Sequence, residues 1–178
     1  MPQAGGALTL ERNGGLLREL KSPVKVAAAA LDWTKPPDKV SDVQAIWDTG
    51  ATGSVITQAV VDKLEIHPIT MTMVHGVGSQ ELSPVFLVDF YLPMGVCVRG
   101  LNVTLGKLVG ADALIGMDVI VTGDFAVTNY GGKTKMSFRV PSLVDIDFVK
   151  DSNVQPTNRQ QRRAEQRNTA KQRKHRTQ

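Results

Sequence analysis

One carboxylate lies where it could do chemistry, at Asp48 in the stretch Ile46–Thr57. An apolar segment ends at Trp47, and Asp48, Thr49 and Gly50 follow before a turn of small residues. A carboxylate at the end of a buried strand is costly unless it is hydrogen-bonded or shares a proton. Thr49 supplies a hydroxyl beside it, and Gly50 lets another backbone segment approach closely. This arrangement is typical of a catalytic acid, whereas the alternative is an ordinary turn aspartate between a strand and a helix.

Hydrolysis of a peptide bond by carboxyl groups needs two of them, close enough to share one proton. One then acts as a base toward a water molecule, and the other acts as an acid toward the substrate carbonyl. The sequence has a single Asp-Thr-Gly triplet and no internal repeat. Because a two-fold interface brings identical residues together at its axis, the second carboxyl group would come from a second copy of the chain. The sequence therefore predicts a C2 homodimer in which the two Asp48 residues face each other.

Cysteine and histidine usage argues against other kinds of site. Cys97, in an alternating, strand-like context, is the single cysteine, which excludes an internal disulfide and a multi-cysteine metal site. The three histidines, His67, His75 and His175, form no ligand pair at helical spacing. We therefore expect neither a metal nor another cofactor.

Composition places the chain among soluble proteins rich in turns, since 42% of its 178 residues are hydrophobic and it has 16 glycines and 9 prolines. No apolar run approaches the roughly 18 residues of a membrane span, so no transmembrane segment is expected. Residues 1–21 lack the basic-then-apolar pattern of a secretory signal. These observations favour a cytoplasmic protein.

Alternation of apolar and polar residues recurs along the chain and indicates short strands. We predict strands at 24–31, 40–47, 69–74, 82–92, 95–106, 124–130 and 133–140. A two-residue turn at Gly131 and Gly132 would join the last two. A short helix fits 55–64, with Ser54 as its cap, and a helical turn fits the end of 111–121. These patterns predict an all-β, barrel-like fold with one or two short helices.

The same patterns divide the chain into three parts. Residues 1–22 are weakly patterned and are expected to be an N-terminal extension. Residues 23–148 carry the strand patterns and are expected to be the folded domain. In residues 149–178 apolar side chains nearly vanish from Asp151 onward, which predicts a basic, disordered tail.

Three segments, in this order, resemble the retropepsin-like (retroviral-type) aspartic proteases, the single-domain, homodimeric relatives of pepsin. Asp48–Ala51 matches the catalytic motif, Met73–Gly78 resembles the glycine-rich flap, and Leu114–Asp118 resembles the apolar-apolar-glycine segment before the short helix of the family. The resemblance covers residues 24–140. It implies a single-lobe acid-protease β-barrel, active as a C2 homodimer, and hence an aspartic endopeptidase.

By the same resemblance, Asp48 is the catalytic residue of each subunit. The Thr49 hydroxyl would link the two active-site loops, and Gly50 would bind the main chain of the substrate. Ala51 and Leu114 are expected to contact the substrate as well.

The flap residues expected to contact substrate are His75, Gly76, Val77 and Gly78, with Val77 at the tip. Gly116, beneath the active-site loop, would permit tight packing. The alternative for the flap is a plain hairpin with glycines in its turn and His75 as an exposed turn residue.

Two positions depart from the viral pattern. Viral members pair an acidic residue just after the alanine with an arginine after the glycine of the third segment. Here these positions are Thr52 and Met117, so both partners of the ion pair are absent and no lone charge is left buried. This favours a cellular or bacterial type of retropepsin-like protein.

The basic residues gather in the tail. Residues 158–178 carry eight basic side chains against one acid, Glu165, for a net charge of +7, which leaves −3 for residues 1–157. Such a segment could bind the phosphate backbone of nucleic acid, lie on an anionic membrane surface, or act only as a solubility tail.

A rival interpretation of the chain is a catalytically idle peptide-binding module whose tail docks on nucleic acid or ribosomes. In a third, the tail itself carries the main function, as a nucleic-acid-binding segment.

Overall fold

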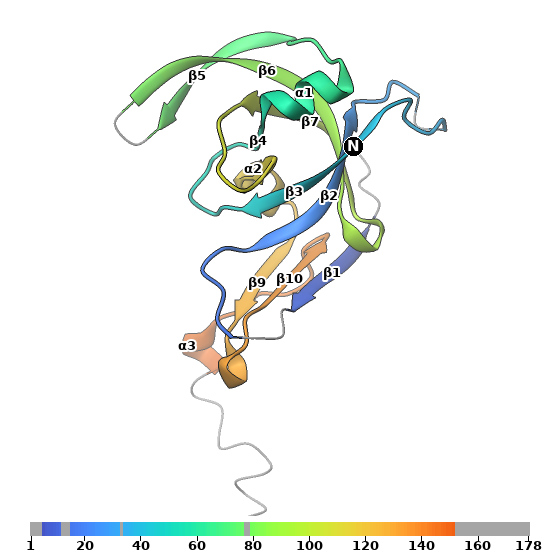
Figure 1. The fold of residues 1–178 in the computed structure, drawn as a ribbon. Coiled ribbons are helices and arrows are strands. Elements are labelled where there is room, and N and C mark those ends of the chain that lie inside the picture. The colour runs from blue at the N-terminus through green and yellow to red at the C-terminus, as the bar shows by residue number, and fades with distance from the viewer. Residues whose placement is uncertain (1–4, 12–14, 33, 77–78, 152–178) are drawn as a thin grey trace, which may run out of the picture. The chain divides into compact units, whose positions relative to one another are not determined.

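The computed structural model describes residues 5–11, 15–32, 34–76 and 79–151. Val77 and Gly78 of the expected flap tip, and the whole basic segment 158–178, lie outside the described residues. The chain forms two compact units, Met1–Leu143 and Val144–Gln178. The first unit contains all the strands of the described residues (Figure 1).

The larger sheet of the described residues has seven strands. They are β2 (Lys21–Ala28), β3 (Val40–Trp47), β4 (Val55–Ile56), β5 (Thr70–Gly76), β6 (Ser79–Tyr91), β7 (Cys97–Leu105) and β8 (Ala113–Ile115). Six of them form a closed barrel in the order β2-β3-β8-β4-β7-β6, because β6 pairs back onto β2. The long β6 strand does this with its second half, while its first half pairs with β5 in a hairpin that projects from the barrel (Figure 1).

Alternating burial shows why these segments are strands. In β3 the residues that face the core are Ser41, Val43, Ala45 and Trp47, each separated by one residue that is more exposed. The two short helices of this unit are α1 (Gln58–Leu64) and α2 (Met117–Ile120), and single helical turns occur at η1 (Pro93–Gly95) and η2 (Tyr130–Gly132). The predicted all-β barrel with few short helices is thereby confirmed.

A smaller antiparallel sheet contains β1 (Gly6–Glu11), β10 (Lys135–Val140) and β9 (Asp124–Thr128), in that order. The sequence pattern predicted no strand at 6–11, which falls in the expected N-terminal extension. The strand forms because Leu8, opposite Phe138, contributes a buried side chain to the core. The boundaries drawn at 22 and 148 stay a prediction.

Trp47 connects the small sheet to the barrel. Its ring stacks on Phe125 at a centroid distance of 5.5 Å and lies at a tilt to Phe138 at 5.1 Å. Its indole N–H donates to the Ser22 hydroxyl oxygen at 2.9 Å, in a buried environment. The residue just before Asp48 is therefore held by packing from strands of both sheets.

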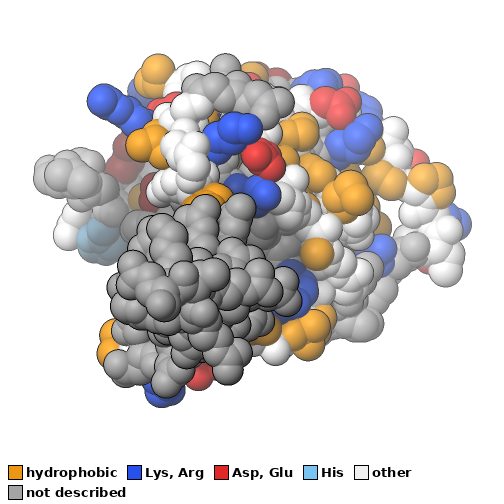
Figure 2. Space-filling view, turned by 90° about the horizontal axis from the view of Figure 1, so that it is seen from below, with side chains coloured by type: hydrophobic (Ala, Val, Ile, Leu, Met, Phe, Trp, Pro, Cys, Tyr) orange, Lys and Arg blue, Asp and Glu red, His pale blue; other side chains and the backbone are white. Residues whose placement is uncertain are grey.

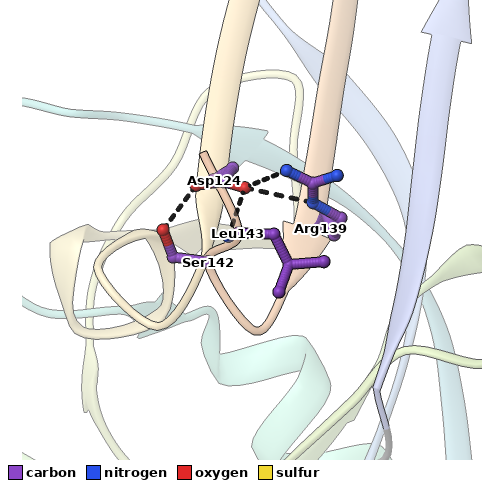
Figure 3. A network of polar contacts seen from close by, with 4 residues as sticks. All are labelled: Asp124, Arg139, Ser142 and Leu143. Carbon is purple, nitrogen blue, oxygen red and sulfur yellow. Dashed lines mark hydrogen bonds and ion pairs between the residues drawn. The ribbon is translucent and has the colours of Figure 1, made fainter. Parts of the chain in front are cut away.

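Asp124, at the start of β9, holds the segment that follows β10 (Figure 3). Its carboxylate accepts from the Ser142 hydroxyl at 2.5 Å, from the Leu143 N–H at 2.9 Å and from the Arg139 Nε at 3.0 Å, and it also pairs with Arg139 Nη2. The Ser142 hydroxyl, the Leu143 N–H and the Arg139 guanidinium, in that order, hold the pKa of Asp124 well below its usual range. The acid is thus ionised in the folded protein at neutral pH.

Three local expectations were wrong. The predicted helix at 55–64 starts only at Gln58, because Val55 and Ile56 form β4 between β7 and β8. Its cap position is Thr57, so Ser54 is not the cap. The last hairpin turns through the longer connection 129–134, which contains η2, in place of a two-residue turn.

In the run Leu143–Phe148, Asp145 and Asp147 alternate with apolar residues, a pattern typical of a strand. The run forms no strand, and the second unit has instead a short helix, α3 (Phe148–Asp151). Asp147 accepts from the N–H groups of Val149 and Lys150 at its start, at 2.9 and 3.2 Å. The aspartate therefore caps this turn.

Figure 2 draws one face of the molecule, on which exposed hydrophobic side chains lie among basic and acidic ones. Within the described residues, no helix is long and apolar enough to cross a membrane.

Candidate active site

Asp48 directly follows β3, where that strand runs parallel to β8. Its N–H donates to the Ile115 carbonyl at 2.9 Å, its carbonyl accepts from the Ala51 N–H at 3.3 Å, and its Oδ1 accepts from the Gly50 N–H at 2.8 Å. The residue is half-buried. These bonds fix the carboxylate at the end of a rigid strand and leave it within reach of solvent.

The loop after Asp48 lies directly on the segment between β8 and α2. The Met117 N–H donates to the Ala51 carbonyl at 2.8 Å, and the Asp118 N–H donates to the Thr52 carbonyl at 3.1 Å. A Cβ on Gly116 would lie 2.7 Å from both the carbonyl carbon and the oxygen of Gly53. Such a contact is too short for any side chain, so the tight packing expected at Gly116 is present and requires glycine.

Ser54 and Asp118 bond to each other at the end of this loop. The Ser54 N–H and hydroxyl donate to the two carboxylate oxygens of Asp118 at 2.8 and 2.7 Å. Asp118 Oδ1 also accepts from the Val119 N–H at 3.0 Å, and the Ser54 Oγ accepts from the Gly116 N–H at 3.1 Å. The sequence pattern predicted Ser54 as a helix cap. It missed this pair because a contact between positions 54 and 118 leaves no local signal.

The structure brings together two of the three segments on which the resemblance was based. Thr49 and Gly50 are exposed, and Ala51 is half-buried. Leu114, also half-buried, lies in β8 opposite Ile46 of β3 on one side and Val55 of β4 on the other. The Leu114–Asp118 segment therefore forms the floor on which the Asp48 loop lies.

The remaining segment, Met73–Gly78, falls in the hairpin of β5 and β6. His75 is exposed opposite Gln80, and β5 ends at Gly76, so the expected tip residues Val77 and Gly78 fall outside the described part of the hairpin. A groove of about 790 Å³ runs between this hairpin, the end of β7 and the start of α1. Its apolar lining includes Val74, Leu82, Pro84, Leu105 and Leu108.

Cys97 is buried at the start of β7. Burial raises the pKa of its thiol, with a smaller opposing effect from Arg99. The thiol therefore stays protonated at neutral pH, as suits a structural cysteine and not a nucleophile.

Comparison with known proteins agrees with this geometry. Residues 38–119, just under half of the chain, match the family model described as aspartyl protease. This segment is similar to the aspartyl proteases that the family model describes. It contains both the Asp48 loop and the β8–α2 segment on which that loop lies, so the resemblance inferred from the sequence is confirmed.

Two solved structures are similar to the chain. A retropepsin-like aspartic protease from Rickettsia conorii matches 79% of this chain and 97% of its own, with 12% sequence identity and a TM-score of 0.48. The foamy viral protease-reverse transcriptase, solved in complex with an RNA/DNA hybrid, matches 57% of this chain and 11% of its own, with 20% identity and a TM-score of 0.38. No curated protein sequence matches the chain.

Proposed function

We propose that this retropepsin-like protein is an aspartic endopeptidase that hydrolyses peptide bonds as a homodimer. The proposal rests on the position of Asp48. This residue is half-buried at the end of β3, and hydrogen bonds to Ile115, Ala51 and Gly50 fix it there. Two such carboxyl groups sharing one proton would activate a water molecule for attack on the peptide carbonyl. The unprotonated carboxylate takes the proton from that water, and the protonated one donates to the carbonyl oxygen.

The second carboxyl group is proposed to come from a second copy. Each chain offers one Asp-Thr-Gly triplet, and Thr49 and Gly50 beside Asp48 are exposed in the single chain. A two-fold axis next to this loop would bring both copies of Asp48 together and cover those exposed residues. The Thr49 hydroxyl is then available to bond the partner loop.

The hairpin of β5 and β6 is proposed to act as the flap over the substrate. β5 is the edge strand of the larger sheet, so it offers unpaired backbone groups to an extended peptide. The apolar groove beside the hairpin, with Val74, Leu82 and Leu105 in its lining, would receive side chains of a peptide substrate. His75, Gly76, Val77 and Gly78 would contact its main chain.

The tail at 158–178 is proposed as an accessory segment that attracts nucleic acid or anionic surfaces. Its net charge of +7 supports attraction that weakens as salt is added. Removal of residues 152–178 should abolish salt-sensitive binding of the protein to a nucleic acid and leave peptide hydrolysis intact. Loss of hydrolysis on this truncation would instead give the tail a role in the enzyme itself.

The test of the enzyme is hydrolysis of an unstructured protein at mildly acidic pH by the wild type and by Asp48→Asn. We expect the variant to lose activity by roughly 10²- to 10⁴-fold or more, since it removes the group that handles the proton. Asp62→Asn, at an exposed position of α1, is the matched control and should keep full activity. Equal hydrolysis by the wild type and Asp48→Asn would eliminate the proposed enzyme in favour of an idle binding module.

A further inference from the structure

We propose that the Ser54–Asp118 pair positions Asp48 for catalysis, as the anchor at the opposite end of the active-site loop. This inference rests on the proposed peptidase function. Neither residue touches the reacting atoms in this assignment, so both are positioning residues, acting through the loop that runs from Asp48 to Ser54.

The bonding of the pair is dense and partly buried. Ser54 is only 1% exposed, and both its N–H and its hydroxyl donate to the Asp118 carboxylate. The Ser54 hydroxyl oxygen also accepts from the Gly116 N–H, and Asp118 Oδ1 also accepts from the Val119 N–H. Four donors thus converge on one hydroxyl and one carboxylate. Hydrogen bonds to a carboxylate are shorter and stronger than neutral ones, so this end of the loop is held firmly.

The loop between the two anchors is held by a few backbone bonds, and at its end the Ser54 carbonyl accepts from the Thr104 N–H at 3.1 Å. At one end the Asp48 N–H bonds the Ile115 carbonyl, and in the middle the carbonyls of Ala51 and Thr52 accept from the start of α2. Ser54 then closes the loop by side-chain bonds to the same segment. If that closure is lost, the loop can shift on the Gly116 backbone and carry Asp48 away from its place.

A shift at this position has a doubled effect. In the proposed dimer, two copies of Asp48 meet across the axis, so a displacement in each chain changes their separation twice. A misplacement of about 1 Å in a catalytic group can cost about 10²-fold in rate. The pair also occupies the region in which Thr52 and Met117 replace the charged partners used by viral relatives. Its bonds therefore hold the active-site loop in a region where this chain has no such ion pair.

The experiment compares Ser54→Ala, Asp118→Asn and Ser54→Thr with the wild type in steady-state hydrolysis of a peptide substrate. We expect kcat to fall by about 10- to 100-fold in Ser54→Ala and Asp118→Asn, with KM changed by less than about threefold. Ser54→Thr keeps the hydroxyl and should restore most of kcat. Ser54→Ala changes no charge, so the bell-shaped dependence of its activity on pH should keep the midpoint of the wild type. The bell should become narrower, because the two Asp48 carboxyl groups move apart and their titrations couple less strongly.

A second serine–aspartate pair in the same chain gives the matched control. Ser142 donates to Asp124 in the small sheet, outside the 48–54 loop, so Ser142→Ala and Asp124→Asn remove similar bonds elsewhere. These controls should lower the melting temperature and leave kcat and the pH profile unchanged. Melting temperature and solution mass are measured for every variant, so that unfolding or loss of the dimer is separated from misplacement.

Two outcomes overturn the inference. If folded, dimeric Ser54→Ala keeps the kcat and pH profile of the wild type, the pair is only structural and the proposed function is untouched. If Ser54→Thr is as impaired as Ser54→Ala while both stay folded, the hydroxyl is not the responsible group. Absence of hydrolysis by the wild type would instead reject the proposed function itself, and this inference with it.

Discussion

At the scale of single residues, the hydrogen bonds that Asp48 and Asp118 accept suit the two aspartates to different roles. Both carboxylate oxygens of Asp118 accept from protein donors of the loop and of α2. Asp48 is half-buried and accepts the N–H of Gly50 through Oδ1. The Asp118 carboxylate is thus bonded through both of its oxygens to donors of its own chain, whereas the Asp48 carboxylate is bonded through one. Asp48 is therefore the better candidate for proton transfer, and Asp118 for positioning.

Asp124 predicts how the stability of the protein depends on pH. Its pKa is lowered in the folded protein, so its bonds to Ser142, Leu143 and Arg139 stabilise the fold above its usual value of 3.8. That contribution is lost progressively as the pH falls below this value and through the lowered pKa. Asp124→Asn should be less stable than the wild type at pH 7, and the difference should shrink as the pH falls below about 4.

Urea unfolding of both proteins at pH 7, 5 and 3 measures this difference. Asp145→Asn, at an exposed position, is the control and should show no comparable change. A difference between wild type and Asp124→Asn that stays constant from pH 7 to pH 3 would contradict the assignment.

Gly116→Ala tests the close approach of the loop to its floor. The added Cβ would lie 2.7 Å from the Gly53 backbone and 3.0 Å from the Ala51 carbonyl oxygen, so one of the two segments must move. We expect the free energy of unfolding to fall by roughly 1–3 kcal/mol, together with loss of hydrolysis. Gly5→Ala, whose Cβ would meet its nearest atom at 3.4 Å, should be close to neutral in denaturant unfolding.

At the scale of elements, the bond between Trp47 and Ser22 joins β3 to β2 beneath the small sheet. Ser22→Ala would leave the indole N–H buried without its acceptor and should destabilise the protein by about 1–3 kcal/mol. In a Trp47→Phe background the same serine change should cost clearly less, because no donor is left behind. Chemical unfolding of the wild type, the two single variants and the double variant measures the coupling energy between Ser22 and Trp47. If the two changes in the free energy of unfolding simply add, the bond contributes nothing to stability.

The local sequence pattern predicted most of the strands, because the alternation of apolar and polar residues along a strand is visible in a few consecutive residues. The strand at 40–47 was predicted with the bounds that it has, and the helix at 55–64 was found with its start misplaced. β1 was missed because its stability comes from pairing with β10, more than a hundred residues away. The Asp48 motif could be read directly, whereas the Ser54–Asp118 pair could not, since it depends on tertiary contact between two segments.

At the scale of the whole molecule, the proposed shared site predicts that an inactive chain inhibits an active one. Wild-type chains mixed with excess Asp48→Asn would form dimers with a single competent carboxyl group. At about ninefold excess, hydrolysis per wild-type chain should fall about tenfold once the subunits have exchanged. The same excess of Asp62→Asn should cause no such loss, and hydrolysis unaffected by Asp48→Asn would show that each chain works alone.

The pairing of β1 with β10 also bears on the order in which the protein folds during synthesis. The first strand emerges from the ribosome early, but its neighbour spans Lys135–Val140, so the small sheet cannot be completed until nearly all of the first unit has been made. Contacts of such high sequence separation form late and slow folding. Until then Leu8 and the aromatic face of Trp47 lack their partners, so the nascent chain exposes apolar surface of the kind that chaperones bind.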